Sequence, residues 1–161
     1  MSNKNKLPWY VKQNCLAIVR GYNQARKEYL RMRKEILDAG GAGGGSATPF
    51  VDPKTGETMW TLIPTQHVAS RSTENKAMRL EALEQTAAYK QIKAVEHAQA
   101  RIGEGLPEPM RDLLRDGLMI NCMNGRKYSF ERLYIVGICR SDFYRYRDQF
   151  FRMIAAELGL F

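Results

Sequence analysis

Cysteine and histidine are scarce in this chain of 161 residues, which contains three cysteines and two histidines. Cys15, Cys122 and Cys139 stand far apart, and their spacing fits neither a disulfide framework nor a zinc motif. Free thiols are typical of a reducing compartment, so we expect a cytoplasmic protein. His97 has no partner at metal-ligand spacing, and we expect no metal ion or other cofactor.

Long apolar runs are also missing. No stretch approaches the ~20 apolar residues that a membrane-spanning helix needs. The first ten residues, MSNKNKLPWY, lack the apolar core of a signal peptide. The sequence therefore predicts a protein that is not associated with a membrane.

The motifs of common enzyme classes are absent as well. The chain has no glycine-flanked serine and no Cys–His pair at a useful spacing. The glycine-rich stretch 39–49 is not followed by the Gly-Lys-Ser/Thr of a phosphate-binding loop. We expect that the protein is not an enzyme, although two carboxylates brought together from distant segments would leave no signature in the sequence.

Positive charge is what the chain has in excess. Its formal net charge is +8 and its pI is near 9.5, which favours an anionic partner. Residues 1–38 carry nine Lys or Arg against three Asp or Glu, whereas residues 106–161 carry nine against seven. The strongest electrostatic attraction is therefore expected from the N-terminal segment.

Apolar periodicity predicts an all-α fold in four parts. A basic N-terminal helix covers 1–38, and 39–72 holds a glycine-rich flexible linker, Ala39–Pro49, with a small β-hairpin near 50–63. A long amphipathic helix follows over 73–105, and it could serve either a helix bundle or the seam of a homodimer. Residues 106–161 are predicted to form a helix-turn-helix domain.

The helix-turn-helix prediction depends on the stretch from Ser129 to Phe151. Ser129 is a suitable N-cap for a short first helix, and Gly137 supplies the freedom that a tight turn requires. A second helix is expected to begin at Arg140 or Ser141. Leu133, Ile138 and Phe143 then form the apolar trio that packs the two helices together.

The second helix separates an apolar stripe from a polar face. The stripe is Phe143, Tyr146, Phe150, Ile154 and Leu158, and the opposite face carries Arg140, Ser141, Tyr144, Arg145 and Asp148. Such a face could enter a major groove, or it could belong to a helical hairpin that only packs. The candidate DNA-binding residues are Arg140, Ser141, Tyr144, Arg145, Arg126, Lys127 and Arg147, of which Arg126 and Lys127 precede the motif and would contact phosphates.

The order of these parts resembles the RinA/ArpU-type phage transcriptional regulators. The most specific match is CRSDFYRYRDQF, which is similar to the recognition helix of that family, whose helix-turn-helix resembles sigma factor region 4. The likeness covers 73–161 and, more loosely, 9–38. It implies that Arg140, Ser141, Tyr144 and Arg145 face DNA while Phe143, Tyr146 and Phe150 fill the core. Cys139 replaces the usual serine cap, and Asp142 and Asp148 add negative charge near the expected DNA face.

The expected function is therefore sequence-specific binding of double-stranded DNA by a regulator of transcription, with the late operon of a phage or prophage implied by the resemblance. The sequence is also compatible with two alternatives. The chain could be a DNA-packaging subunit similar to a small terminase, or a module that docks on RNA polymerase without reading DNA. Native mass would separate a packaging ring from a regulator that is a monomer or a homodimer.

Overall fold

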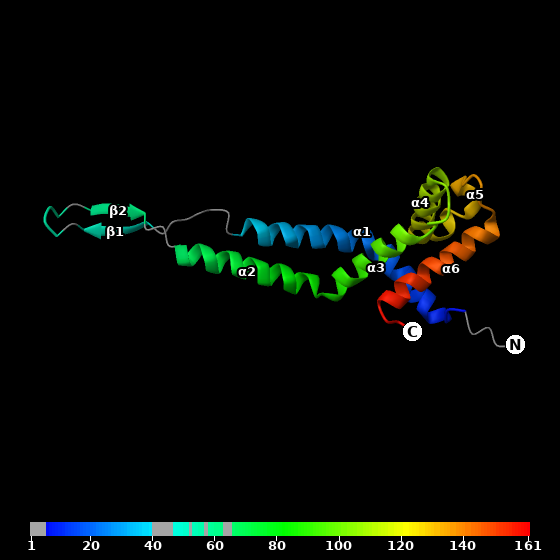
Figure 1. Ribbon diagram of the computed structural model, residues 1–161, viewed down its shortest axis with the longest axis horizontal. Helices are drawn as coiled ribbons and strands as arrows, with labels where there is room; N and C mark the ends of the chain where they lie inside the picture. Colours follow the sequence, from blue (N-terminus) through cyan, green and yellow to red (C-terminus); the bar gives the residue numbers. More distant parts are fainter. Residues whose placement is uncertain (1–5, 40–46, 52, 57, 63–65) are drawn as a thin grey trace. The chain divides into compact units, whose positions relative to one another are not determined.

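The computed structural model describes residues 6–39, 47–51, 53–56, 58–62 and 66–161 (Figure 1). The chain forms two compact units. One unit combines Met1–Glu28 with Thr86–Phe161, and the other is Tyr29–Gln85. The second unit is thus inserted in the sequence between the two halves of the first, and this division differs from the four consecutive parts that we predicted.

The inserted unit contains the last part of helix α1 (Trp9–Asp38), strands β1 (Ala47–Val51) and β2 (Thr58–Leu62), and helix α2 (Gln66–Glu84). The strands are antiparallel, with Ala47 opposite Leu62, so the predicted hairpin is present. The predicted linker, 39–49, is only partly described: 40–46 lie outside the described residues, and 47–49 belong to β1 rather than to a linker.

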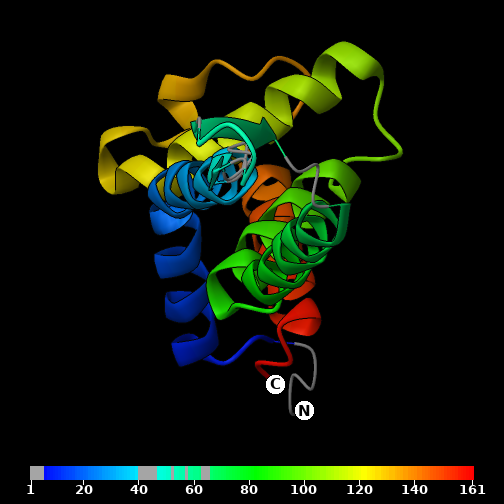
Figure 2. The same cartoon turned by 90° about the vertical axis from the view of Figure 1, so that its left-hand side faces the viewer.

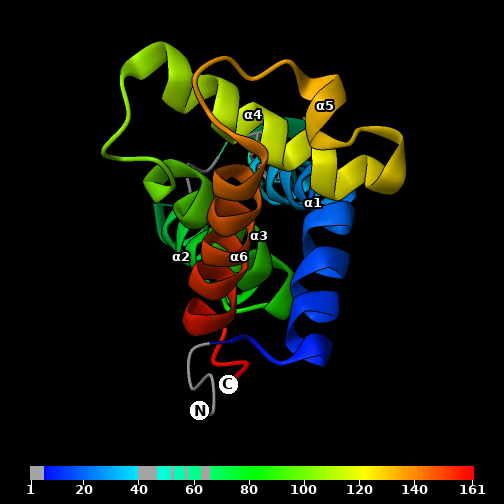
Figure 3. The same cartoon turned by 90° about the vertical axis from the view of Figure 1, so that its right-hand side faces the viewer.

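The first unit contains the first part of α1, α3 (Ala87–Arg101), α4 (Glu108–Asn124), a 3₁₀ helix (Gly125–Lys127), α5 (Phe130–Leu133) and α6 (Arg140–Glu157). Figure 1 shows the beginning of α1 crossing α3 and α6, and Figures 2 and 3 show α4 crossing one end of α6. Apart from the hairpin, the described chain is helical, which confirms the predicted all-α fold.

The N-terminal helix is not a part of its own, contrary to the four-part division that we predicted. Val11, Cys15 and Val19 recur every fourth residue and are completely or almost completely buried in the same core as Val95 and Phe150. Two polar contacts join this helix to α6. Lys12 Nζ lies 2.8 Å from Asp148 Oδ1, and Cys15 Sγ donates to the carbonyl oxygen of Phe151 over 3.4 Å. The beginning of α1 therefore completes the core of the C-terminal unit.

The long helix predicted over 73–105 is two helices, which is a second correction. Helix α2 ends at Glu84, and Thr86 takes an extended conformation with φ −65° and ψ 148°. The Thr86 hydroxyl accepts a hydrogen bond from the backbone N–H of Tyr89, 3.3 Å away, and so caps α3. The apolar spacing continues across this break, so periodicity alone did not reveal it.

The three cysteines differ in accessibility, and this difference predicts which of them a thiol reagent can label. Cys15 and Cys122 are buried, and burial raises the pKa of each thiol to about 11, whereas Cys139 is exposed. Because the thiolate is the reactive species, a thiol reagent at pH 8 should label Cys139 alone in the native protein and all three thiols after unfolding. Mass spectrometry of the labelled protein measures this, and native labelling of Cys15 or Cys122 would contradict the burial.

The raised pKa values of Cys15 and Cys122 also determine how the stability of the protein changes with pH. The ordinary thiol pKa is 9.0, and burial moves it to about 11 in the folded protein. The folded state therefore holds protons that the unfolded state has lost between these values. The contribution of the two thiols to stability is fully present below pH 9 and is lost as the pH rises toward 11.

Candidate nucleic-acid interface

The helix-turn-helix motif consists of α5, a turn over residues 134–139 and α6. Helix α6 begins at Arg140, as predicted, and the short first helix, α5, ends at Leu133. Tyr134 at its end has a left-handed conformation with φ 50°, and Gly137 has φ 89°. A Cβ atom on Gly137 would overlap the Cε atom of Met110 in α4, so the turn packs closely on that helix.

Phe143 lies where the motif packs together. It is completely buried, and its ring centroid is 5.3 Å from that of Phe130, at the start of α5. Ile138 is buried in the same core, with Leu133 at its edge. The predicted apolar trio is therefore present, and it fixes which side of α6 faces outward.

The outward side of α6 carries a continuous polar row. We call it the exposed stripe, and it consists of Ser141, Arg145, Gln149 and Arg152. All four residues are exposed, and their spacing of four, four and three places them on one face of the helix. Each side chain can hydrogen-bond the edge of a base in a major groove, most favourably arginine with guanine and glutamine with adenine.

Gln149 and Arg152 were not among the residues predicted from the sequence. Helical spacing in the sequence could have identified them, because Gln149 lies four residues after Arg145 and Arg152 lies three residues after Gln149. The polar face predicted from the sequence ended at Asp148. The structure instead pairs Asp148 with Lys12 and so turns it toward α1.

Two predicted arginines at the start of α6 are exposed and paired with carboxylates. Arg140 Nη1 lies 3.0 Å from Glu131 Oε1 of α5, and Arg145 Nη2 lies 2.6 Å from Asp142 Oδ1, with 69% and 75% of the arginine side chains exposed. Hydrogen bonds from the Glu131 backbone N–H and from Ser129, together with Arg140, hold the pKa of the Glu131 carboxyl below its ordinary value. Ion pairs this exposed are weak, so both guanidinium groups stay available to a stronger partner.

Ser129 and Cys139 occupy the N-cap positions of α5 and α6, but neither side chain caps its helix. The Ser129 hydroxyl instead donates a hydrogen bond to the Glu131 carboxylate. Cys139 Sγ and Ser141 Oγ lie 3.0 Å apart, within hydrogen-bonding distance. Ser141, the first residue of the exposed stripe, therefore has a hydrogen-bond partner in the turn before α6.

The structure does not place Arg147 at a DNA face, contrary to our prediction. Its Nη1 donates to Asn121 Oδ1 over 2.9 Å, and Asn121 Nδ2 donates to the Tyr128 carbonyl oxygen over 2.7 Å. Its guanidinium also lies over the rings of Tyr144 and Phe151, 5.5 Å from each centroid. Because Asn121 is buried and Arg147 is half-buried, this arginine holds α6 against α4.

Tyr144 is half-buried, and it therefore differs from the open face that was predicted for it. Its ring meets the ring of Phe143 edge-on, with centroids 5.4 Å apart. The Arg140 guanidinium lies 5.9 Å from the Tyr144 ring centroid, so this tyrosine supports the arginine at the start of α6.

Arg126 and Lys127 lie in the 3₁₀ helix that precedes the motif. The Lys127 side chain is exposed, and its carbonyl oxygen accepts a hydrogen bond from Arg132 Nη1 over 2.9 Å. The side chain of Arg126 lies outside the described part of the structure. Lys127 therefore precedes the motif and does not belong to the exposed stripe.

A cleft between α3 and α6 lies beside the far end of the exposed stripe. It has a volume of about 550 Å³, and Arg101, Gln149 and Arg152 are among its lining residues. His97 Nδ1 and Glu157 Oε1 lie 2.7 Å apart in the same cleft. Arg101 of α3 thus adds a cationic side chain to the surface that continues from α6.

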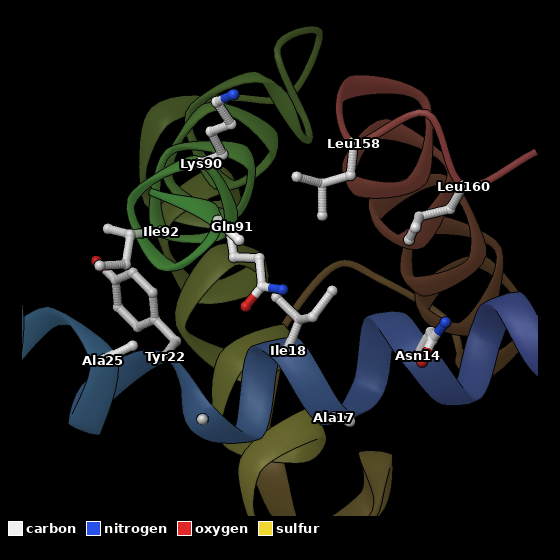
Figure 4. A pocket seen from close by; sticks show the side chains of 12 residues that line it. Asn14, Ala17, Ile18, Tyr22, Ala25, Lys90, Gln91, Ile92, Leu158 and Leu160 are labelled. Atoms are coloured by element: carbon white, nitrogen blue, oxygen red, sulfur yellow. The ribbon is translucent and has the colours of Figure 1, made fainter. Parts of the chain in front are cut away.

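A second hollow, of about 540 Å³, lies between α1, α3 and the end of α6 (Figure 4). Figure 4 shows Ile18, Gln91 and Leu158 around its centre. The alanines Ala17 and Ala25 have short side chains and Gly21 has none, which leaves space along α1, and Lys90 is the cationic residue of the lining. This hollow is mainly apolar and lacks the row of donors that α6 presents, so we place the candidate interface on α6.

Three observations bear on other classes of partner. Among the described residues, no helix combines the length and apolarity needed to cross a membrane, and no group of three or more His, Cys, Asp or Glu is placed to hold a metal ion. Comparison with protein-family models, curated proteins and solved structures gives no match. The resemblance to phage regulators therefore stays a prediction.

Proposed function

We propose that this protein binds double-stranded DNA in a sequence-specific manner and regulates transcription. The observation that carries the proposal is the exposed stripe of α6. Four donor-rich side chains lie on one face of a helix whose other faces are fixed by Phe143, Arg147 and the Lys12–Asp148 ion pair. A rigid helix that presents such a row can place it in a major groove. The late operon of a phage or prophage is the setting that the sequence resemblance implies.

The charge distribution supports the same function. The net charge of +8 favours approach to DNA, and Arg101, Lys127, Arg140, Arg145 and Arg152 are exposed in the unit that contains α6. Non-specific attraction and base recognition can then come from different residues, which is the usual division in proteins that bind DNA.

The turn of the motif favours a second candidate, a protein contact such as docking on RNA polymerase. Tyr134 and Val136 are 84% and 78% exposed, and both belong to the turn that connects α5 with α6. Apolar side chains this open suit a protein surface more than a phosphate backbone. This candidate and DNA binding can be separated by the experiment below.

The test contrasts Arg145 with Arg126 and Lys127. Arg145→Ala should weaken binding to the preferred site by about 1–3 kcal/mol and reduce discrimination between sites, because a guanine edge loses a bidentate donor. Replacing Arg126 and Lys127 with alanine should weaken all duplexes about equally and lower the salt slope by up to about 2. A preferred duplex is first selected from a randomised library, and it is then titrated beside a scrambled duplex at several salt concentrations.

The possible outcomes distinguish groove contact from phosphate contact, and DNA binding from a protein contact. Equal weakening on both duplexes by Arg145→Ala would assign that residue to phosphate contact and remove it from the groove. If the native protein bound no duplex but was retained by RNA polymerase, with retention lost on replacing Tyr134 and Val136 by serine, the protein-contact candidate would replace DNA binding.

A further inference from the structure

Arg145 is held by a carboxylate on its own helix, although it is the most exposed arginine of the ion pairs at the start of α6. Its Nη2 lies 2.6 Å from Asp142 Oδ1, one turn earlier, and the Asp142 side chain is 41% exposed. The two residues are spaced i and i+3, which places them side by side on the helix surface. Any DNA that meets Arg145 therefore also meets the charge of Asp142.

We propose that Asp142 is a positioning residue that orients Arg145 toward a guanine and weakens its attraction to phosphates elsewhere on the DNA. This inference rests on the proposed function, and it explains how the protein distinguishes its preferred site from other DNA. A guanidinium group has five N–H donors. Asp142 occupies part of one edge, and the remaining donors are free to form the two parallel hydrogen bonds to O6 and N7 of guanine.

The same ion pair lowers non-specific affinity. Binding to arbitrary DNA depends on the number of phosphates that free cations neutralise, because each such contact releases counterions. Asp142 reduces the positive charge that Arg145 presents to a phosphate, and its carboxylate repels a phosphate that approaches the pair. Because the pair is exposed, DNA can still compete for the guanidinium group. At a guanine edge, in contrast, the arginine can keep Asp142 as a partner and gains a fixed orientation from it.

Asp142 also has an ordinary structural role, since it lies in the first turn of α6, where a negative charge stabilises the helix. The two roles predict opposite results for Asp142→Asn. Loss of the helix contribution alone would loosen the start of α6 and weaken binding to every duplex. Loss of the positioning role would strengthen binding to arbitrary duplexes.

Asp148 offers a matched control on the same helix. Its carboxylate pairs with Lys12 of α1 over 2.8 Å, so it belongs to the side of α6 that packs on α1 rather than to the exposed stripe. Asp148→Asn raises the net charge by the same amount as Asp142→Asn, but leaves the Arg145 pair intact. Asp142→Glu is the conservative variant, because it retains the negative charge beside Arg145.

The experiment titrates the full chain and these three variants on a preferred duplex, selected from a randomised library, and on a scrambled duplex, over a range of salt concentrations. Asp142→Asn should bind the scrambled duplex roughly two to five times more tightly at low salt. Its salt slope on that duplex should rise by about 0.9. The ratio of preferred to scrambled affinity should fall, while Asp142→Glu and Asp148→Asn keep the native slope.

An unchanged or weaker affinity of Asp142→Asn for the scrambled duplex, with an unchanged slope, would overturn the positioning role while leaving DNA binding in place. Equal tightening by Asp148→Asn would also overturn it, because net charge alone would then explain the effect. If the native protein bound neither duplex under any of these conditions, the proposed function itself would fail, and this inference with it. Thermal unfolding of each variant identifies any loss of folded protein.

Discussion

Replacing Phe143 with alanine is expected to lower the free energy of unfolding by about 3–5 kcal/mol. The ring is completely buried, and it contacts Phe130 of α5 and Tyr144 of α6. Alanine would leave a cavity between the two helices of the motif, and the short α5 has few other contacts with which to compensate. Chemical denaturation of the native protein and the variant measures the difference.

Gln149→Ala is the matched control for this prediction. Gln149 lies in the same helix but is exposed, so its replacement should change the free energy of unfolding by no more than about 0.5 kcal/mol. A transition of Phe143→Ala that coincided with that of the native protein would show that the ring does not fill the core described here.

Gly137→Ala is expected to destabilise the protein by about 2–4 kcal/mol. Gly137 has φ 89°, where a side chain strains the backbone, and its Cβ would overlap Met110 Cε. Met110 is flexible and can move in part, but the backbone strain remains. The turn between α5 and α6 should loosen, and any DNA binding should weaken with it. Thermal or chemical unfolding gives the stability term.

The same substitution at Gly21 should have the opposite sign. Gly21 lies inside α1, and an added Cβ would meet nothing within 4 Å. Gly21→Ala should therefore stabilise the protein by about 0.5–1 kcal/mol, because alanine has the higher helix propensity. If Gly137→Ala were as harmless as Gly21→Ala, the left-handed turn would not be a requirement of this fold.

Local signals in the sequence were sufficient for the motif itself. Helix α6 begins at Arg140 as predicted, and Gly137 has the positive φ that the turn was expected to need. Phe143 and Phe150 are completely buried, as the apolar stripe indicated. These features depend on residues close together in the chain, where side-chain periodicity and turn chemistry act directly.

Long-range packing explains what the sequence did not reveal. A helix with neighbours on two sides buries more than one stripe, and periodicity identifies only the most apolar of them. Arg147 and Asp148 are polar and so looked fully open to solvent, but Arg147 bonds Asn121 of α4 and the half-exposed Asp148 pairs with Lys12 of α1. Nothing near Arg147 in the sequence indicates that a residue 26 positions earlier accepts its hydrogen bond.

The break at Thr86 was missed for a different reason. Threonine is a common N-cap, but an isolated threonine inside an apolar repeat gives only a weak signal. The repeat continued through it, and α3 begins where the Thr86 hydroxyl accepts a hydrogen bond from the Tyr89 N–H. The boundary between the two compact units falls at this position.

The partnership between α1 and α6 has a consequence for synthesis on the ribosome. Lys12 and Cys15 contact residues that lie 136 positions later in the chain. At 5–20 residues per second, roughly 7–27 s separate the emergence of these partners. During that interval Val11, Cys15 and Val19 have no core to enter, and they present an apolar face that chaperones can bind. The inserted unit, Tyr29–Gln85, emerges complete within the same interval and can form its own contacts first.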